Sequence, residues 1–402
     1  MRTRPHARER QPEKARRRVR GSMTSVGAGS KAQPLRVETI GCEAASDLMP
    51  QALGLTYWFD VGSVGEPYEV DIRFTGRRLG VRGKPGPRDS FSVVESIDHV
   101  LPGSGPIAIT TRVHDIGPGT WQVTAAPSTS ARRAALKPRG LSAERRHLPK
   151  GSMSGTTIYA PIAGVSAPGA YRGVWPVLVS LGAAIALGTQ TALATRARLP
   201  VGSILAVSLI ACVVGLIGAK AYYTAGHLIT GEHRGLRSLL IGGMCIQGFV
   251  LGAISTLIVG ARASGIAVGQ VLDVTAPGLL FAMTIGRFGC FFGGCCAGRP
   301  TSSRGGLWSS DRRLGVRRIP SQLYESAVAL LIGLAALLVL LTTTHIRHGV
   351  VFIGAIAAYT FGRQLVFPLR ANPSHTRYGR VAVLVLAAGA LVLDLLFVTF
   401  AK

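Results

Sequence analysis

The carboxyl-terminal part of the chain alternates long apolar stretches with short polar breaks. From Val174 onward these stretches run for about 18 to 24 residues, close to the roughly 20 that a helix needs to cross a bilayer. Each stretch is therefore expected to form a transmembrane helix. The pattern predicts seven such helices, at residues 174–194, 201–223, 238–260, 265–286, 322–342, 349–367 and 380–400.

Between residues 35 and 126 the pattern changes to short segments in which apolar and polar residues alternate. Six such segments are expected to form strands: LRVETI, LTYWFDV, YEVDIRF, SFSVVES, IAITTRV and TWQVTAA. Breaks rich in glycine and proline, at residues 62–67 and 117–119, separate these segments at a spacing typical of a small β-sandwich. The fold expected is a polytopic α-helical membrane protein with seven transmembrane helices, preceded by a small all-β sandwich-like domain.

The remaining segments show neither the long apolar runs of transmembrane helices nor the alternation of strands. Nine of the first 20 residues are Arg or Lys and no apolar run accompanies them, so residues 1–34 are expected to form a basic disordered arm. Residues 127–170 mix Ser, Gly, Pro and Arg, which is the composition of a flexible linker. The domains expected are thus an arm at 1–34, a sandwich at 35–126, a linker at 127–170 and a membrane domain at 171–402.

Composition supports the membrane assignment. The chain is 48% hydrophobic and 16% charged, which is too apolar for an ordinary soluble enzyme and excludes a disordered chain or a coiled coil. Its net charge is +26, with basic excess in both the amino-terminal and membrane parts. Basic residues around apolar spans typically face anionic lipid headgroups. No nucleic-acid-binding module accompanies the charge, so we expect membrane lipids, and not nucleic acid, as partners.

Ionisable side chains at membrane depth are costly and indicate function by default. Five occur in or at the ends of the predicted spans: Lys220, Asp273, Arg287, Glu325 and Arg363. Arginine binds phosphate oxygens in a bidentate fork, so Arg287 and Arg363 predict a clamp for a lipid phosphate. The alternative is that Asp273 and Glu325 only neutralise these arginines in structural pairs. Spacing alone does not decide between the two.

The connection at residues 287–321 strings together glycines, arginines and cysteines. A Gly-rich segment that begins inside a span indicates a cavity lining, because non-helical backbone at membrane depth needs polar partners. Cys290, Cys295 and Cys296 lack the Cys-x-x-Cys spacing of zinc sites and have no histidine nearby, so no metal is expected. Packing between helices is favoured, with a disulfide or an acyl-accepting thiol as alternatives.

Two segments carry a resemblance to a known family. Residues 286–301, GRFGCFFGGCCAGRPT, resemble the signature of bacterial prolipoprotein diacylglyceryl transferases, and 318–325, RIPSQLYE, is similar to that family's His-Pro-Ser-Gln-Leu-Tyr-Glu segment. The resemblance covers roughly residues 172 to 400. Shorter matches follow the family's order, namely ATR at 194–196, GAKAY at 218–222, GGM at 242–244, VLDVTAP at 271–277 and YTFGR at 359–363.

The resemblance implies a multi-pass enzyme of the bacterial inner, or plasma, membrane. It would transfer the diacylglyceryl group of phosphatidylglycerol to the lipobox cysteine of preprolipoproteins and release glycerol phosphate, without metal or organic cofactor. Arg287 and Arg363 would stabilise the leaving phosphate, Tyr359 would hold or polarise the headgroup, and Gly298 would permit close backbone approach. We assign four further residues to substrate binding: Gln247, Gln322, Tyr324 and Glu325.

The chain departs from the family at positions that bear on proton transfer. Gln247 stands in place of a histidine, and glutamine cannot act as a general base. Cys290 replaces an asparagine, while Cys295 and Phe367 replace glutamates. The arginines thus persist without the acid–base groups, which indicates altered proton handling or a different acceptor. The alternative function is a non-catalytic or differently specific protein that binds phospholipid headgroups.

The orientation of the spans is argued in two ways. The family places its amino terminus and the fourth connection outside, whereas the distribution of basic residues favours an amino end that faces inside. Because the arginines of the fourth connection are explained by phosphate binding, we expect the family orientation, with the sandwich outside the membrane.

Overall fold

The computed structural model describes residues 33–39, 47–128, 148–229, 244–343, 347–371 and 378–400. The predicted basic arm lies outside these ranges except for Gln33 and Pro34, as do Cys42 and the pair Gly242-Gly243 of the resemblance.

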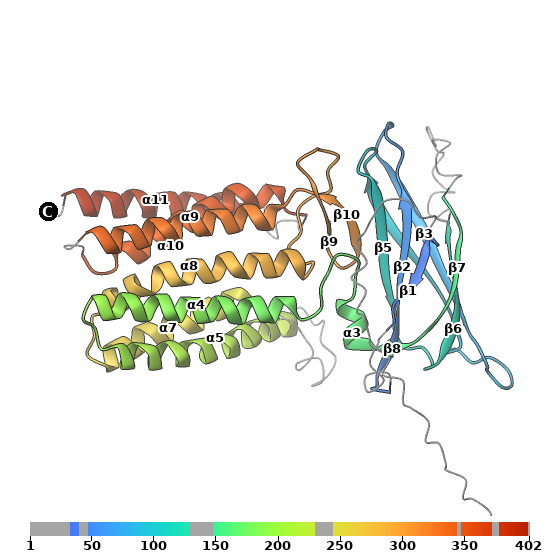
Figure 1. The fold of residues 1–402 in the computed structure, drawn as a ribbon, viewed down its shortest axis with the longest axis horizontal. Helices are drawn as coiled ribbons and strands as arrows, with labels where there is room; N and C mark the ends of the chain where they lie inside the picture. The colour runs from blue at the N-terminus through green and yellow to red at the C-terminus, as the bar shows by residue number, and fades with distance from the viewer. Residues whose placement is uncertain are drawn as a thin grey trace, which may run out of the picture. The chain divides into compact units, whose positions relative to one another are not determined.

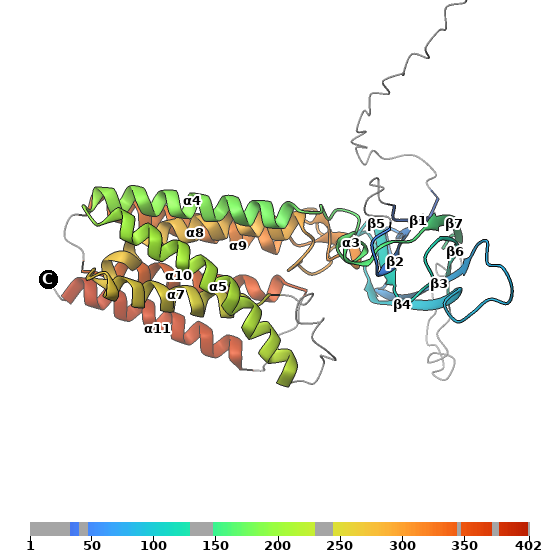
Figure 2. The same cartoon turned by 90° about the horizontal axis from the view of Figure 1, so that it is seen from below.

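Seven helices in the described part of the chain are long and apolar enough to span a membrane, which confirms the prediction. Both Figure 1 and Figure 2 show α4 lying beside α8. In the last helix, α11, only 6% of the most apolar 18-residue segment is buried, as expected of a helix that faces lipid. The helices are α4 (Val174–Arg196), α5 (Val201–Ile229), α7 (Ile246–Ala263), α8 (Val268–Phe292), α9 (Ser321–Thr342), α10 (Val350–Val366) and α11 (Gly379–Phe400).

Several predicted helix boundaries were wrong. In the third span Met244 and Cys245 precede the helix, which begins at Ile246, and the predicted residues 238–243 lie outside the described residues. Helix α5 continues to Ile229 instead of ending at 223, and α8 continues to Phe292 instead of ending at 286. Arg287 and Cys290 are therefore helical residues, not part of a connecting loop. Glycines allow α8 to pack closely on α4: a Cβ on Gly278 would lie 2.5 Å from the Ala186 carbonyl oxygen.

Asp273 of α8 caps the start of α10. One carboxylate oxygen accepts a hydrogen bond from the Gly349 amide at 2.6 Å, and the other from the Phe352 amide at 2.9 Å. These amides lack partners within their own helix, and a carboxylate at a helix N-terminus also opposes the helix dipole favourably. Asp273 thus serves the fold, and the alternative that it neutralises an arginine is wrong for the described residues.

We expect Asp273→Ala to lower the free energy of unfolding by about 2 kcal/mol, because it leaves two buried amides without an acceptor. Asp273→Asn keeps one acceptor oxygen and should lose roughly half as much. Both are measured by denaturant unfolding of the detergent-solubilised protein. Equal stability of Asp273→Ala and the parent protein would contradict the capping role.

The amino-terminal part is a sandwich of two antiparallel sheets, and all six predicted strands are present. Tyr57, Phe74 and Trp121 fill the core between the sheets. One sheet has the order β1-β2-β5-β10-β9 with β8 beside β2, and the other β4-β3-β6-β7. The six predicted strands are β1 (Leu35–Val37), β2 (Gln51–Asp60), β3 (Tyr68–Arg78), β4 (Ser90–Val100), β5 (Pro106–Val113) and β6 (Thr120–Pro127).

The segment predicted as a linker contains regular structure. Strand β7 (Gly151–Thr156) pairs with β6, β8 (Ile158–Tyr159) pairs with β2, and the short helix α3 (Ala160–Val165) follows. The described sandwich strands of this region therefore continue to Tyr159 and do not stop at 126. The apolar pattern did not reveal strand β7 because its inward positions include glycine. A Cβ on Gly155 would lie 2.4 Å from the Val37 side chain.

A hairpin from the connection between α8 and α9 joins the sandwich (Figure 1). Its strands are β9 (Leu307–Ser310) and β10 (Leu314–Arg318), and Leu314 pairs with Ile109 of β5. Trp308 stacks on Trp58 with ring centres 5.6 Å apart. Four spans separate the sandwich from this connection, and an even number of crossings returns a chain to the same side. The shared sheet agrees with that count. Which side is the outer one stays a prediction.

Candidate functional site

Helices α8, α9 and α10 bring three of the predicted residues together. The Arg287 Nη2 lies 2.6 Å from Glu325 Oε2, and the Tyr359 side chain lies next to the Arg287 guanidinium. On its other side Glu325 faces Arg370, with 3.5 Å between Oε1 and Nη1. Glu325 is only 1% exposed. One buried carboxylate thus joins two guanidinium groups.

Several donors of this cluster lack a partner. Among the described residues, no well-formed hydrogen bond reaches the Tyr359 hydroxyl, the Arg363 Nε or the Arg370 Nε, although all three atoms are buried. Arg363 follows Tyr359 by four residues on α10, so both lie on one helix face. Buried donors without acceptors need an explanation, and three arginines exceed the charge of Glu325. The site therefore suits an anion with several oxygens, such as a phosphate.

The turn after α8 is anchored beside this cluster. Arg299 donates its amide to the Leu369 carbonyl at 2.8 Å, and Ala371 donates to Ala297 at 2.9 Å. The buried Arg318 donates to the Gly298 carbonyl at 3.0 Å and pairs with Asp311 at 2.8 Å. Burial lowers the pKa of Arg318, and the charge of Asp311 opposes this. These bonds fix the backbone that leads to Arg370.

Gly298 sits where no side chain fits. A Cβ there would lie 1.9 Å from the Ile319 carbonyl oxygen, so this glycine lets two backbone segments pack closely. Its role in substrate binding stays a prediction. We expect Gly298→Ala to lower the free energy of unfolding by about 3 kcal/mol, because backbone must shift to admit the methyl group. Denaturant unfolding in detergent measures this. Gly286→Ala is the matched control, since no atom lies within 4 Å of its Cβ. If both variants unfold alike, the packing argument at Gly298 fails.

The other predicted site residues fall into two groups. Gln322 is buried and donates to the Cys295 carbonyl at 3.0 Å, which places it against the turn. Tyr324 is 43% exposed. Gln247 is exposed in the first turn of α7, where it accepts a hydrogen bond from Cys245 at 2.6 Å. Among the described residues no hydrogen bond or ion pair joins Tyr324 or Gln247 to the arginine cluster.

Three free thiols lie beside the cluster. The sulfur atoms of Cys290, Cys295 and Cys296 are all within 4.8 Å of one another. Hydrogen bonds from Cys290 and Cys295 lower the pKa of the Cys296 thiol, and the positive charges of Arg370 and Arg287 lower it further. Hydrogen bonds with Cys290 and Cys296 raise the pKa of Cys295.

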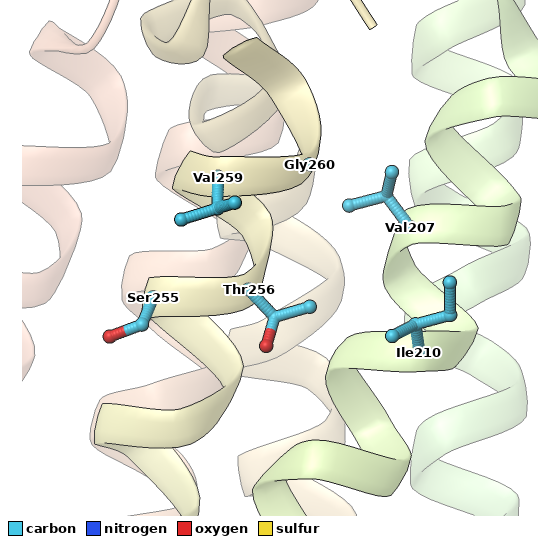
Figure 3. A pocket seen from close by; sticks show the side chains of 6 residues that line it. All are labelled: Val207, Ile210, Ser255, Thr256, Val259 and Gly260. Atoms are coloured by element: carbon cyan, nitrogen blue, oxygen red, sulfur yellow. The ribbon is translucent and has the colours of Figure 1, made fainter. Parts of the chain in front are cut away.

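A cavity of about 380 Å³ lies elsewhere, between α5 and α7. Figure 3 shows its lining of Val207, Ile210, Ser255, Thr256, Val259 and Gly260. None of these side chains is charged, so the cavity does not suit a phosphate.

Comparison with known proteins places these observations in a family. The model of the family described as prolipoprotein diacylglyceryl transferase matches residues 173–397, which is more than half of the chain and runs from α4 into α11. The chain belongs to the prolipoprotein diacylglyceryl transferase family. It is accordingly a multi-pass membrane transferase. Strands β1 to β8 of the sandwich precede the part that matches the family, whereas the hairpin of β9 and β10 lies within it.

The chain is similar to several curated family members named phosphatidylglycerol–prolipoprotein diacylglyceryl transferase. It is 35% identical over 200 residues to that of Cutibacterium acnes, covering 46% of this chain and 67% of the relative. It is 35% identical over 217 residues to enzyme 2 of Streptomyces coelicolor, covering 50% and 67%. With the protein of Geobacillus kaustophilus it shares 29% identity over 206 residues, covering 49% and 76%.

The sequence of this transferase did not lead us to predict Arg370 as a site residue. The structure buries it to 7% exposure against Glu325. No helical spacing could have found it, because α10 ends at Val366 and Arg370 follows the short 3-10 turn at Phe367–Leu369 in an extended conformation.

Proposed function

We propose that this chain transfers the diacylglyceryl group of phosphatidylglycerol to the lipobox cysteine of preprolipoproteins in the bacterial plasma membrane. The observation that carries the proposal is that the Tyr359 hydroxyl, the Arg363 Nε and the Arg370 Nε are buried without a hydrogen-bond partner among the described residues, which matches the needs of a lipid phosphate. The names of the curated relatives agree with this choice of lipid and acceptor.

The arrangement suits the chemistry of this transfer. The acceptor thiolate attacks the glycerol carbon that bears the phosphate, the carbon–oxygen bond breaks, and glycerol phosphate leaves with the electron pair. Negative charge grows on the phosphate as this bond breaks. Arg287, held in place by Glu325, and Arg363 stabilise that charge, and Tyr359 donates its hydroxyl to a phosphate oxygen. Water-poor surroundings between helices strengthen these interactions.

The test is a transfer assay with the full chain in lipid nanodiscs. Phosphatidylglycerol labelled in an acyl chain is supplied with a lipobox peptide, and label is expected on the peptide. A peptide with serine in place of the lipobox cysteine is the control. A protein that only binds headgroups would retain labelled lipid and leave the peptide unlabelled, which would refute the proposed activity.

A further inference from the structure

The three thiols have the spacing of a metal site. A zinc ion binds thiolate sulfur at about 2.3 Å, so two sulfurs on a tetrahedral zinc lie about 3.8 Å apart. The sulfurs of Cys290, Cys295 and Cys296 all fall within 4.8 Å of one another. One ion could therefore contact all three with small side-chain adjustments.

The backbone is built to hold this arrangement. Cys290 belongs to the last turn of α8, and Cys295 returns to it by donating its amide to the Cys290 carbonyl at 3.0 Å. Gly294 and Cys296 adopt positive φ values of 63° and 55°, which turn the chain back on itself. Gln322 of α9 binds the Cys295 carbonyl. Residues from two helices thus fix the turn that gathers the thiols.

The surroundings of the three thiols suit anionic thiolates, because the cluster of Arg287, Glu325 and Arg370 lies beside them. Arg287 precedes Cys290 by three residues on α8, so the two side chains lie on one face of that helix. Three thiolates on Zn²⁺ carry a net charge of −1, which these arginines offset. A nucleophile held here would be adjacent to the proposed leaving group.

We propose that Cys290, Cys295 and Cys296 bind a zinc ion whose fourth position takes the acceptor cysteine thiol. Zinc with three protein ligands keeps such a position open, and a thiol that coordinates zinc is deprotonated outright. The ion would supply the activation that Gln247 cannot provide as a base. The inference rests on the proposed function for its acceptor, and it concerns cysteines whose spacing in the sequence gave no sign of a metal.

The step balances without any redox change. Zinc displaces the protons of the three ligand thiols when it binds, and the acceptor thiol loses its proton on coordination. The acceptor sulfur then forms the carbon–sulfur bond as the carbon–oxygen bond breaks. Glycerol phosphate leaves with the electron pair and takes up a proton from solvent. The product is a neutral thioether, a weaker ligand than thiolate, so it leaves the zinc.

The first experiment measures metal binding by the reduced full chain in nanodiscs. One zinc per chain is expected by elemental analysis, and Co²⁺ in its place should give thiolate-to-cobalt charge-transfer absorption. Cys290→Ser should lose both signals. Cys212→Ser is the matched control, because Cys212 is a free cysteine of α5 outside the cluster, and it should keep both. Failure to bind either metal, or equal binding by Cys290→Ser, would overturn the proposal.

The second experiment separates this inference from the proposed function. A lipobox peptide should change the cobalt spectrum as a fourth sulfur binds, and the serine peptide should not. Removal of zinc should lower label transfer at least about 100-fold, with recovery on adding zinc. Full transfer by zinc-free protein would overturn the zinc proposal and leave the proposed function standing. A cobalt spectrum that responds to the peptide while no preparation transfers label would uphold the thiol site and overturn the proposed function.

Discussion

Arg287→Leu is expected to lower the rate of label transfer by about 100- to 1000-fold and to destabilise the protein. The rate falls because the variant loses a fixed donor to the charge that grows on the phosphate. Stability falls because Glu325 is buried and Arg287 lies 2.6 Å from it, whereas the remaining partner, Arg370, is 3.5 Å away. Breaking one side of a buried ion pair costs about 3 kcal/mol.

Initial rates with labelled phosphatidylglycerol and denaturant unfolding in detergent measure these two effects. Arg262→Leu is the matched control, since Arg262 is an exposed arginine at the end of α7, and it should change neither quantity. A Glu325→Leu change in the same background should restore part of the stability, because no buried carboxylate is then left with an incomplete partner, but it should not restore transfer. Normal transfer by Arg287→Leu would remove this residue from the mechanism.

The parts of the fold that follow from the sequence are those in which burial repeats along the chain. Strand β6 alternates exposed and buried positions, with Trp121, Val123 and Ala125 facing inward, and its apolar pattern shows this directly. Strand β7 alternates in the same way, but Gly151 and Gly155 occupy inward positions against Leu35 and Val37. Hydrophobicity does not report a position that is buried because it has no side chain.

The pairing of strands that are far apart in the sequence could also not be predicted from the local apolar pattern. The hairpin of β9 and β10 is rich in arginine and joins β5, which lies about two hundred residues earlier in the chain. Its contacts are specific: Arg313 pairs with Glu95 at 2.7 Å, and Trp308 stacks on Trp58. The connection that carries Gly298 is thus hydrogen-bonded into the sandwich. No local sequence feature encodes that register.

The site residues could be predicted in part from the free-energy cost of burying a charged side chain in the membrane. It selected Arg287, Glu325 and Arg363 from the spans, and the structure places all three on the helices that form the cluster. The same rule selected Asp273, which caps a helix instead. Whether a buried carboxylate meets a guanidinium or a backbone amide depends on how helices pack, so the rule identifies such residues without assigning their roles.

Arg363→Leu is expected to reduce transfer as strongly as Arg287→Leu, by about 100- to 1000-fold, but with the opposite effect on stability. The Arg363 Nε is buried and has no partner among the described residues, so its desolvation is uncompensated in the lipid-free protein. The apolar leucine removes that cost, and the free energy of unfolding should stay equal or rise by about 1 kcal/mol.

The two arginine variants together separate a binding role from a structural one. In nanodiscs, phosphatidylglycerol should stabilise the parent protein more than Arg363→Leu, because the bound phosphate supplies an acceptor to the Arg363 Nε, which has none among the described residues. Phosphatidylcholine, added in equal amount, controls for nonspecific lipid effects. If Arg363→Leu instead unfolded as readily as Arg287→Leu and responded equally to phosphatidylglycerol, Arg363 would be a structural partner of other side chains. If one phosphate binds between the Arg287 and Arg363 guanidinium groups, label transfer should fall in both variants, whereas the free energy of unfolding should fall only in Arg287→Leu.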